Sequence, residues 1–156
     1  MADNKQAQTV YETLLKTLDS RQWHYDRYDD KLTVTMGVNG DDLPMQLIIE
    51  VDADRELIKL LSKLPLTFPE DKRIEGSIVT NIANIRLADG SFDYKFDTGT
   101  VYFRQVSSFK NSLIGKGLID YMIDCACWTI DEYNDKFLMI AKGLMTVQDF
   151  NDSFKD

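Results

Sequence analysis

The spacing of apolar residues near the start of the chain predicts an amphipathic helix over about Asn4–Ser20. Its apolar side carries Val10, Leu14, Leu15 and Leu18. Apolar and polar residues then alternate with period two over Leu32–Val38, which predicts a strand. The sequence Asn39-Gly40-Asp41 predicts the turn that follows this strand.

A second alternating run begins at Pro44, which a strand tolerates at its first residue. One face of this run carries Leu47, Ile49 and Val51, and the acidic residues that follow predict a turn. The next segment, Arg55–Leu64, stays ambiguous, because its leucines fit helical spacing while Ile58, Leu60 and Ser62 fit a strand. Local patterns do not decide between these two structures.

The middle of the chain predicts a loop and then a helix. Pro65, Phe68 and Pro69 mark the loop, and the acidic residues directly after Pro69 suit the positive end of a helix dipole. Isoleucines four, four and three positions apart then form the most regular helical stripe in the chain, at Ile74, Ile78, Ile82 and Ile85. Gly90, close beyond the stripe, suits a left-handed cap of this helix.

Aromatic and charged residues alternate from Phe92 to Phe96, which predicts the first strand of a β-hairpin. With Thr98-Gly99 as a two-residue loop, the predicted register places three pairs opposite each other: Phe96 with Val101, Tyr94 with Phe103, and Asp93 with Arg104. The aromatic face of this hairpin is expected to be buried.

Helical spacing returns from about Phe109 to Lys142, and Asp131 is expected to begin a second helical piece. The first piece carries Ile114, Leu118, Tyr121, Met122 and Cys125 on one side, and the second carries Tyr133, Phe137, Ile140 and Ala141. The sequence Thr146-Val147-Gln148-Asp149 then resembles a capping box with Asp in place of Glu. Residues 144–156 are therefore expected to form a short amphipathic tail that carries Phe150 and Phe154.

The length and composition of the chain fit a single domain, 1–156, with its core at about 10–143. With 156 residues and 44% apolar content, such a core needs no disulfide or metal for stability. The net charge is -8, and the basic residues are scattered apart from the Lys72-Arg73 pair. This distribution argues against nucleic acid and against a membrane as partners.

The first twenty residues lack the pattern of a secretory signal, and no apolar run is long enough to span a bilayer. We therefore expect a cytoplasmic protein. Cys125 and Cys127 lie two positions apart in a predicted helix, so their side chains point apart and cannot form a disulfide with each other. They are expected to be free thiols in a reducing compartment.

Residue types that often carry catalysis occur here in patterns that favour structural roles. The single histidine, His24, has no nucleophile-elbow motif to accompany it, and Cys125 and Cys127 are too few for a zinc site. Gly115-Lys116-Gly117 lacks the spacing of a phosphate-binding loop. The acidic pairs suit turns, at Asp41 and Asp42 and at Asp52 and Asp54. The sequence therefore predicts no enzyme, no cofactor and no metal site.

One motif resembles a known family. The stretch Asn84-Ile85-Arg86-Leu87-Ala88-Asp89-Gly90-Ser91-Phe92 resembles the YbjN family of bacterial proteins, in which N-x-x-L-x-x-G-x-F leads from a helix into a hairpin. The likeness covers about Val10–Gly143. A structural role is favoured for the motif residues Asn84, Leu87, Gly90 and Phe92, with Gly90 in a left-handed turn and Phe92 as a core anchor. Asn84 either binds the neighbouring loop or serves in surface recognition, and the first role is favoured.

The resemblance implies an α+β fold like that of the type III secretion chaperones. The expected structure is an antiparallel sheet of about five strands, a meander plus a hairpin, packed by helices in the order α-β-β-β-α-β-β-α(α). That order makes residues 55–64 a strand. Members of the family are described as sensory-transduction regulators or chaperone-like proteins, so the implied function is a non-enzymatic protein-binding module with a protein partner and a homodimeric state.

The alternative function is a small-ligand sensor. Its aromatic pocket would lie between the sheet and the helices and would be lined by Tyr94, Phe103 and Tyr121.

Overall fold

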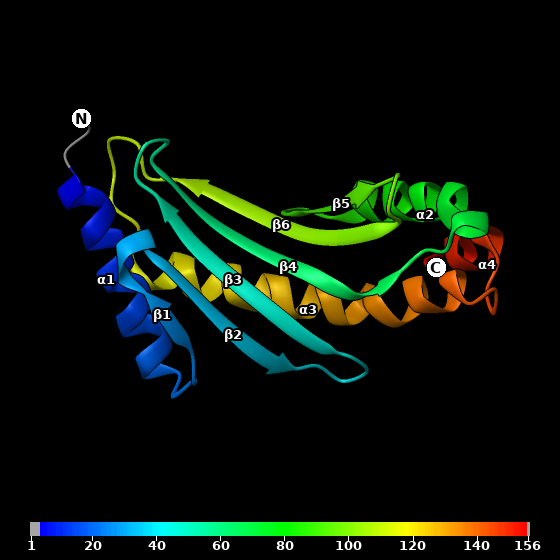
Figure 1. Cartoon of the computed structure of the whole chain (residues 1–156), viewed down its shortest axis with the longest axis horizontal. Coiled ribbons are helices and arrows are strands. Elements are labelled where there is room, and N and C mark those ends of the chain that lie inside the picture. Colours follow the sequence, from blue (N-terminus) through cyan, green and yellow to red (C-terminus); the bar gives the residue numbers. More distant parts are fainter. Residues whose placement is uncertain (1–3, 156) are drawn as a thin grey trace.

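The computed structural model describes residues 4–155 and contains an antiparallel sheet of six strands packed by helices (Figure 1). The strands are β1 (Asp26–Tyr28), β2 (Thr33–Asn39), β3 (Pro44–Asp52), β4 (Leu57–Thr67), β5 (Ser91–Lys95) and β6 (Thr100–Ser108). Their order across the sheet is β1-β2-β3-β4-β6-β5. The expected α+β fold is confirmed, with β1 as a short strand in addition to the expected meander and hairpin.

The helices pack against the sheet from one side and around its ends. They are α1 (Asn4–Ser20), α2 (Arg73–Arg86), α3 (Lys116–Ala141) and α4 (Val147–Asp152), with 3-10 turns η1 (Asp29–Lys31) and η2 (Glu70–Lys72). Figure 1 shows α3 running behind the sheet along its length, with α1 near one end of α3 and α2 and α4 near the other. The predicted opening helix is therefore confirmed as α1.

The core lies between the helix-facing side of the sheet and the helices. Burial alternates along β3, where Met45, Leu47, Ile49 and Val51 are buried while Gln46 and Ile48 on the opposite face are exposed. This alternation confirms the predicted faces of the strand, since successive side chains of a strand point to opposite sides of the sheet.

The segment that local patterns left ambiguous is strand β4, as the family resemblance implied. The strand continues through Pro65 to Thr67, so the predicted loop at Pro65 is wrong. Proline has no N–H to give to a sheet, and the pairing of β4 with β6 shifts register between Lys63 and Thr67. This irregularity in the ladder accommodates the proline inside the strand.

The register predicted for the hairpin is wrong by two residues. Tyr94 pairs with Val101 and Phe92 pairs with Phe103, because the turn comprises the four residues 96–99 rather than two. The Gly99 N–H donates to the Lys95 carbonyl oxygen at 2.8 Å, and this places Phe96 in the turn, where it is exposed. The expected Asp93–Arg104 pair forms as a diagonal ion pair, with Arg104 Nε 2.6 Å from Asp93 Oδ2.

The long C-terminal helix differs from the prediction at its start and in its continuity. Helix α3 begins at Lys116 rather than near Phe109, and its 26 residues pass through Asp131 without a break. Its buried side carries Ile119, Met122, Ile123, Ala126 and Ile130, whereas Tyr121 is half-exposed. The buried stripe lies one residue further along the helix than predicted. Apolar residues occupy positions 118 and 119 and positions 122 and 123, so the sequence allows two adjacent stripes.

The isoleucine stripe predicted a helix correctly, but α2 turns most of that stripe outward. Ile74 and Ile85 are 67% and 78% exposed, and Ile78 is also exposed. The residues that α2 buries are smaller, namely Gly76, Val79, Thr80 and Ala83. Gly90 has the expected left-handed conformation, with φ of 74°, but it does not cap α2, because the helix already ends in extended backbone at Leu87.

The C-terminal segment is packed into the core. The Asp149 N–H donates to the Thr146 hydroxyl at 3.0 Å and the Thr146 N–H donates to Asp149 Oδ2 at 3.1 Å, so the predicted capping box is confirmed. Phe150 of α4 is fully buried, with its ring stacked 5.7 Å from that of Phe137. The core thus extends beyond residues 10–143, from Ala7 to Phe150.

Candidate functional site

Asn84 of α2 binds the backbone of β5, one of the two edge strands of the sheet. Its Nδ2 donates to the Phe92 carbonyl oxygen at 2.9 Å, and the Phe92 N–H donates to its Oδ1 at 2.7 Å. The amide therefore offers the edge strand the same donor and acceptor that another strand would offer. The surface-recognition alternative for Asn84 would need an amide free to meet a partner, whereas both polar atoms of this side chain have an internal partner.

The other three motif residues surround this contact. Phe92 is buried against Phe103, Tyr133 and Phe137. A Cβ on Gly90 would lie 2.5 Å from the Phe103 ring, so both the positive φ and the close approach require glycine here. Leu87 is half-buried against the core. This geometry supports a structural role for the motif, which remains a prediction.

Replacing Asn84 with alanine is expected to lower the free energy of unfolding by about 2 kcal/mol, because it leaves the N–H and carbonyl of Phe92 without partners. Urea unfolding followed by circular dichroism measures this change. The matched control is Asn81→Ala on the exposed side of the same helix, which we expect to be neutral or slightly stabilising. Equal effects of the two substitutions would contradict a special role for Asn84.

The three aromatic residues predicted to line a ligand pocket lie in different surroundings. Phe103 is fully buried and packs edge-on against Phe92 at 5.6 Å. Tyr94 packs edge-on against Phe68 at 5.7 Å, and its hydroxyl donates to the Arg73 carbonyl oxygen at 2.8 Å. Tyr121 is half-exposed on α3. The structure does not place the three around a common opening, because Phe103 has no exposed surface to offer a ligand.

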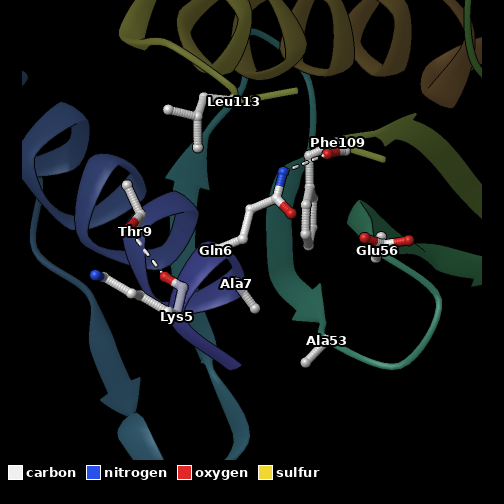
Figure 2. A pocket seen from close by; sticks show the side chains of 8 residues that line it. All are labelled: Lys5, Gln6, Ala7, Thr9, Ala53, Glu56, Phe109 and Leu113. Carbon is white, nitrogen blue, oxygen red and sulfur yellow. Dashed lines mark hydrogen bonds between the residues drawn. The ribbon is translucent and has the colours of Figure 1, made fainter. Parts of the chain in front are cut away.

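A hollow of about 470 Å³ that the sequence did not indicate lies between the start of α1 and the two loops at one end of the β4–β6 pair, one before β4 and one after β6 (Figure 2). Lys5, Gln6, Ala7, Thr9, Ala53, Glu56, Phe109 and Leu113 line it. The Gln6 amide points across the hollow and donates to the Phe109 carbonyl oxygen at 2.8 Å. Three separate segments supply these residues, so only the folded chain brings them together.

The residues considered for catalysis are dispersed. His24 is exposed in the loop between α1 and β1. Asp52 accepts a hydrogen bond from the Arg55 N–H and lies 2.7 Å from Lys59 Nζ. The hydrogen bond from Lys59 holds the pKa of this carboxyl below its usual range, so Asp52 is suited to a turn and an ion pair rather than to general-acid chemistry.

The two cysteines are free, as predicted. Burial raises the pKa of the Cys127 thiol to about 11, and a thiol in this state is a weak nucleophile and a weak metal ligand near neutral pH. Over residues 4–155 no three His, Cys, Asp or Glu side chains gather in an arrangement that could hold a metal ion. In the same range no helix has the length and apolar character needed to cross a membrane.

Comparison with known proteins gives a result at the level of the fold. No family model matches the sequence, and no curated protein matches it. A chain of the HopA1–SchA chaperone–effector complex is 15% identical, with a TM-score of 0.51 over 78% of this chain and 92% of that chain.

Two further solved structures have the same fold. YbjN from E. coli, provisionally assigned as a transcription regulator, is 12% identical, with a TM-score of 0.58 over 82% of this chain and 93% of its own. An uncharacterised protein from Methanothermobacter thermautotrophicus is 12% identical, with a TM-score of 0.53 over 86% of this chain and 97% of its own. The chain therefore has the α+β fold of YbjN and of a chain of a chaperone–effector complex, as the motif at Asn84–Phe92 implied.

Proposed function

We propose that the protein is a non-enzymatic, cytoplasmic protein-binding module with a chaperone-like or regulatory role, and that it acts as a homodimer. The observation that carries this proposal is the exposed isoleucine stripe of α2, formed by Ile74, Ile78 and Ile85. Surface helices normally turn their apolar stripe to the core, and a contiguous exposed one commonly marks an interaction surface.

The inward packing of α2 explains why the stripe faces out. A Cβ added to Gly76 would lie 2.6 Å from the Tyr94 hydroxyl and 2.7 Å from the Phe68 ring, so the helix approaches the core too closely for large residues on that side. Asn84, on the same inward side, must also reach the backbone of β5. Small and polar residues therefore occupy the inner side, and the large apolar ones remain for a partner.

A second copy of the chain suits this stripe. In an antiparallel pair of α2 helices, two stripes with spacings of four and seven residues can interdigitate about a two-fold axis, as ridges of one helix enter grooves of the other. The HopA1–SchA complex supports the protein-binding part of the proposal, because its matched chain belongs to a chaperone–effector assembly.

Replacing Ile78 with glutamate is expected to convert the homodimer to a monomer, because a charge then lies in the middle of the apolar contact. Light scattering coupled to size exclusion measures the mass directly. The control is Leu144→Glu, which introduces the same charge at a residue that is 70% exposed outside α2. A wild-type monomer would contradict the homodimer, and a dimer that survives Ile78→Glu would contradict the α2 stripe as its interface.

Affinity capture from the native host then tests the binding function itself. Tagged wild-type protein is expected to retain a partner in a defined stoichiometry, measured by light scattering of the eluted complex. A wild-type protein that elutes alone at every salt concentration would count against a protein-binding role.

A further inference from the structure

The outer side of α3 carries a hollow of about 460 Å³ that residues of this helix line. Tyr121, Cys125, Trp128 and Thr129 form it together with Asp120 and Asp124. Trp128 is 74% exposed, and Tyr121, two turns earlier on the helix, is half-exposed. Residues 121, 125 and 128 share one side of the helix, so the two aromatic rings flank a single shallow surface.

The core does not account for these aromatic residues. The opposite side of α3 already supplies the buried residues Ile119, Ile123, Ala126 and Ile130. Tryptophan and tyrosine are the residues most often found at the energetic centres of protein interfaces, because they combine a large apolar area with a polar atom. An exposed tryptophan in a hollow is therefore a candidate anchor for a partner.

The charges around Trp128 are acidic. Asp124, Asp131 and Glu132 lie four residues before, three after and four after Trp128, so all three adjoin it on the helix surface. Arg21 pairs with both Asp120 and Asp124 at 2.8 Å, and Lys116 also pairs with Asp120, but within residues 4–155 neither Asp131 nor Glu132 forms an ion pair. The nearby Lys136 donates to the Glu132 carbonyl oxygen, at 2.9 Å.

Further carboxylates lie near Asp131 and Tyr121. Burial raises the pKa of Asp131, the carboxylates of Asp41, Asp42 and Asp135 act in the same direction, and a hydrogen bond from the Asp41 N–H opposes them. The Asp89 carboxylate likewise raises the pKa of Tyr121. The negative charge beside Trp128 is thus larger than the charge of the helix alone, and it is complementary to a cationic partner.

We infer that this surface, the Trp128 surface (Tyr121, Cys125, Trp128 and Thr129 with Asp124, Asp131 and Glu132), docks a basic amphipathic segment of a partner protein. An apolar side chain of that segment fills the hollow, and its lysine or arginine side chains meet the carboxylates and the aromatic faces. This inference rests on the proposed protein-binding function and adds the chemistry of the partner. The Trp128 surface is separate from the α2 stripe.

A displayed library of short random peptides, selected on the full-length protein, tests the inference. Selected peptides are expected to combine net positive charge with apolar residues. Trp128→Ser is expected to weaken their binding by at least about tenfold in fluorescence anisotropy, which is the loss typical of an interface anchor. Glu132→Gln is expected to weaken binding about twofold to threefold, as for a peripheral charge, whereas the matched Glu12→Gln on α1 leaves it unchanged.

Peptides that are neutral or acidic, peptides whose affinity is unchanged by Trp128→Ser, and a library that yields no binder would each overturn the inference. If the Trp128→Ser variant still binds a captured natural partner, the docking role of the Trp128 surface is contradicted, while the protein-binding function stands. If the wild-type protein binds no partner at all, the proposed protein-binding function is itself contradicted.

Discussion

Replacing Gly99 with alanine is expected to destabilise the protein by about 3 kcal/mol or more, which is a large share of the stability of a domain of this size. Gly99 has a φ of 70°, where an L-residue is strained by roughly 1–2 kcal/mol. An added Cβ would also overlap the carbonyl oxygen of Phe68 and lie 2.9 Å from its carbonyl carbon.

That overlap falls on a contact that joins two strands. The Phe68 N–H donates to the Gly99 carbonyl oxygen at 2.9 Å, so the end of β4 is bound to the β5–β6 turn at this point. Backbone atoms cannot rotate away as a side chain can, and the substitution must therefore open the turn or displace the chain after β4.

Urea unfolding of the wild type and two glycine variants measures this effect. The matched control is Gly117→Ala, where no atom lies within 4 Å of the added Cβ and the residue is in the first turn of α3. This control is expected to gain up to about 1 kcal/mol from the higher helix propensity of alanine. Similar stability of both variants would show that the turn at Gly99 is more adaptable than the structure indicates.

Replacing Phe137 with alanine is expected to lower the free energy of unfolding by about 4 kcal/mol, because it removes a fully buried ring and leaves a cavity. Phe137 lies at the centre of the aromatic part of the core. Its ring is 5.0 Å from that of Phe92, 5.7 Å from Phe150, 5.9 Å from Tyr133 and 6.3 Å from Phe68. The cavity would thus separate α3 from the hairpin and from α4 at once.

Trp128→Ala provides the control for this second substitution. Tryptophan is the larger side chain and lies on the same helix, but its exposure predicts a change within about 0.5 kcal/mol. Thermal unfolding of the two variants separates a role in the fold from a role in binding. A large loss of stability in Trp128→Ala would also argue that the Trp128 surface is structural.

Patterns confined to one element could be predicted from the sequence, as β3 and the α4 capping box illustrate. β4 could not be assigned from its own residues, because Leu57 and Leu61 on the less buried face blur the period-two pattern. The hairpin register failed because the turn length depends on the contact of Gly99 with Phe68, which is distant in sequence.

Sites formed between elements were the least accessible to sequence reasoning. The motif residue Asn84 was recognised, but its partner was not, since the contact depends on how α2 lies along β5. The exposure of the α2 stripe could not be predicted either, because helical spacing defines a side of a helix and not the direction in which that side faces. Asp131, one turn from Trp128, has Asp41 and Asp42 of the β2–β3 turn as neighbours, and this grouping of carboxylates exists only after folding.

The pairing of Asn84 with Phe92 also limits how copies of this sheet can assemble. A fibre of sheets grows only when each copy presents two complementary edges, one for each neighbour. Here the β5 edge is bound by α2 at its Phe92 backbone, and the opposite edge is the three-residue strand β1. Strand addition by another chain is thus directed to the β1 edge, and a stack of sheets would lack the second free edge that it needs to grow.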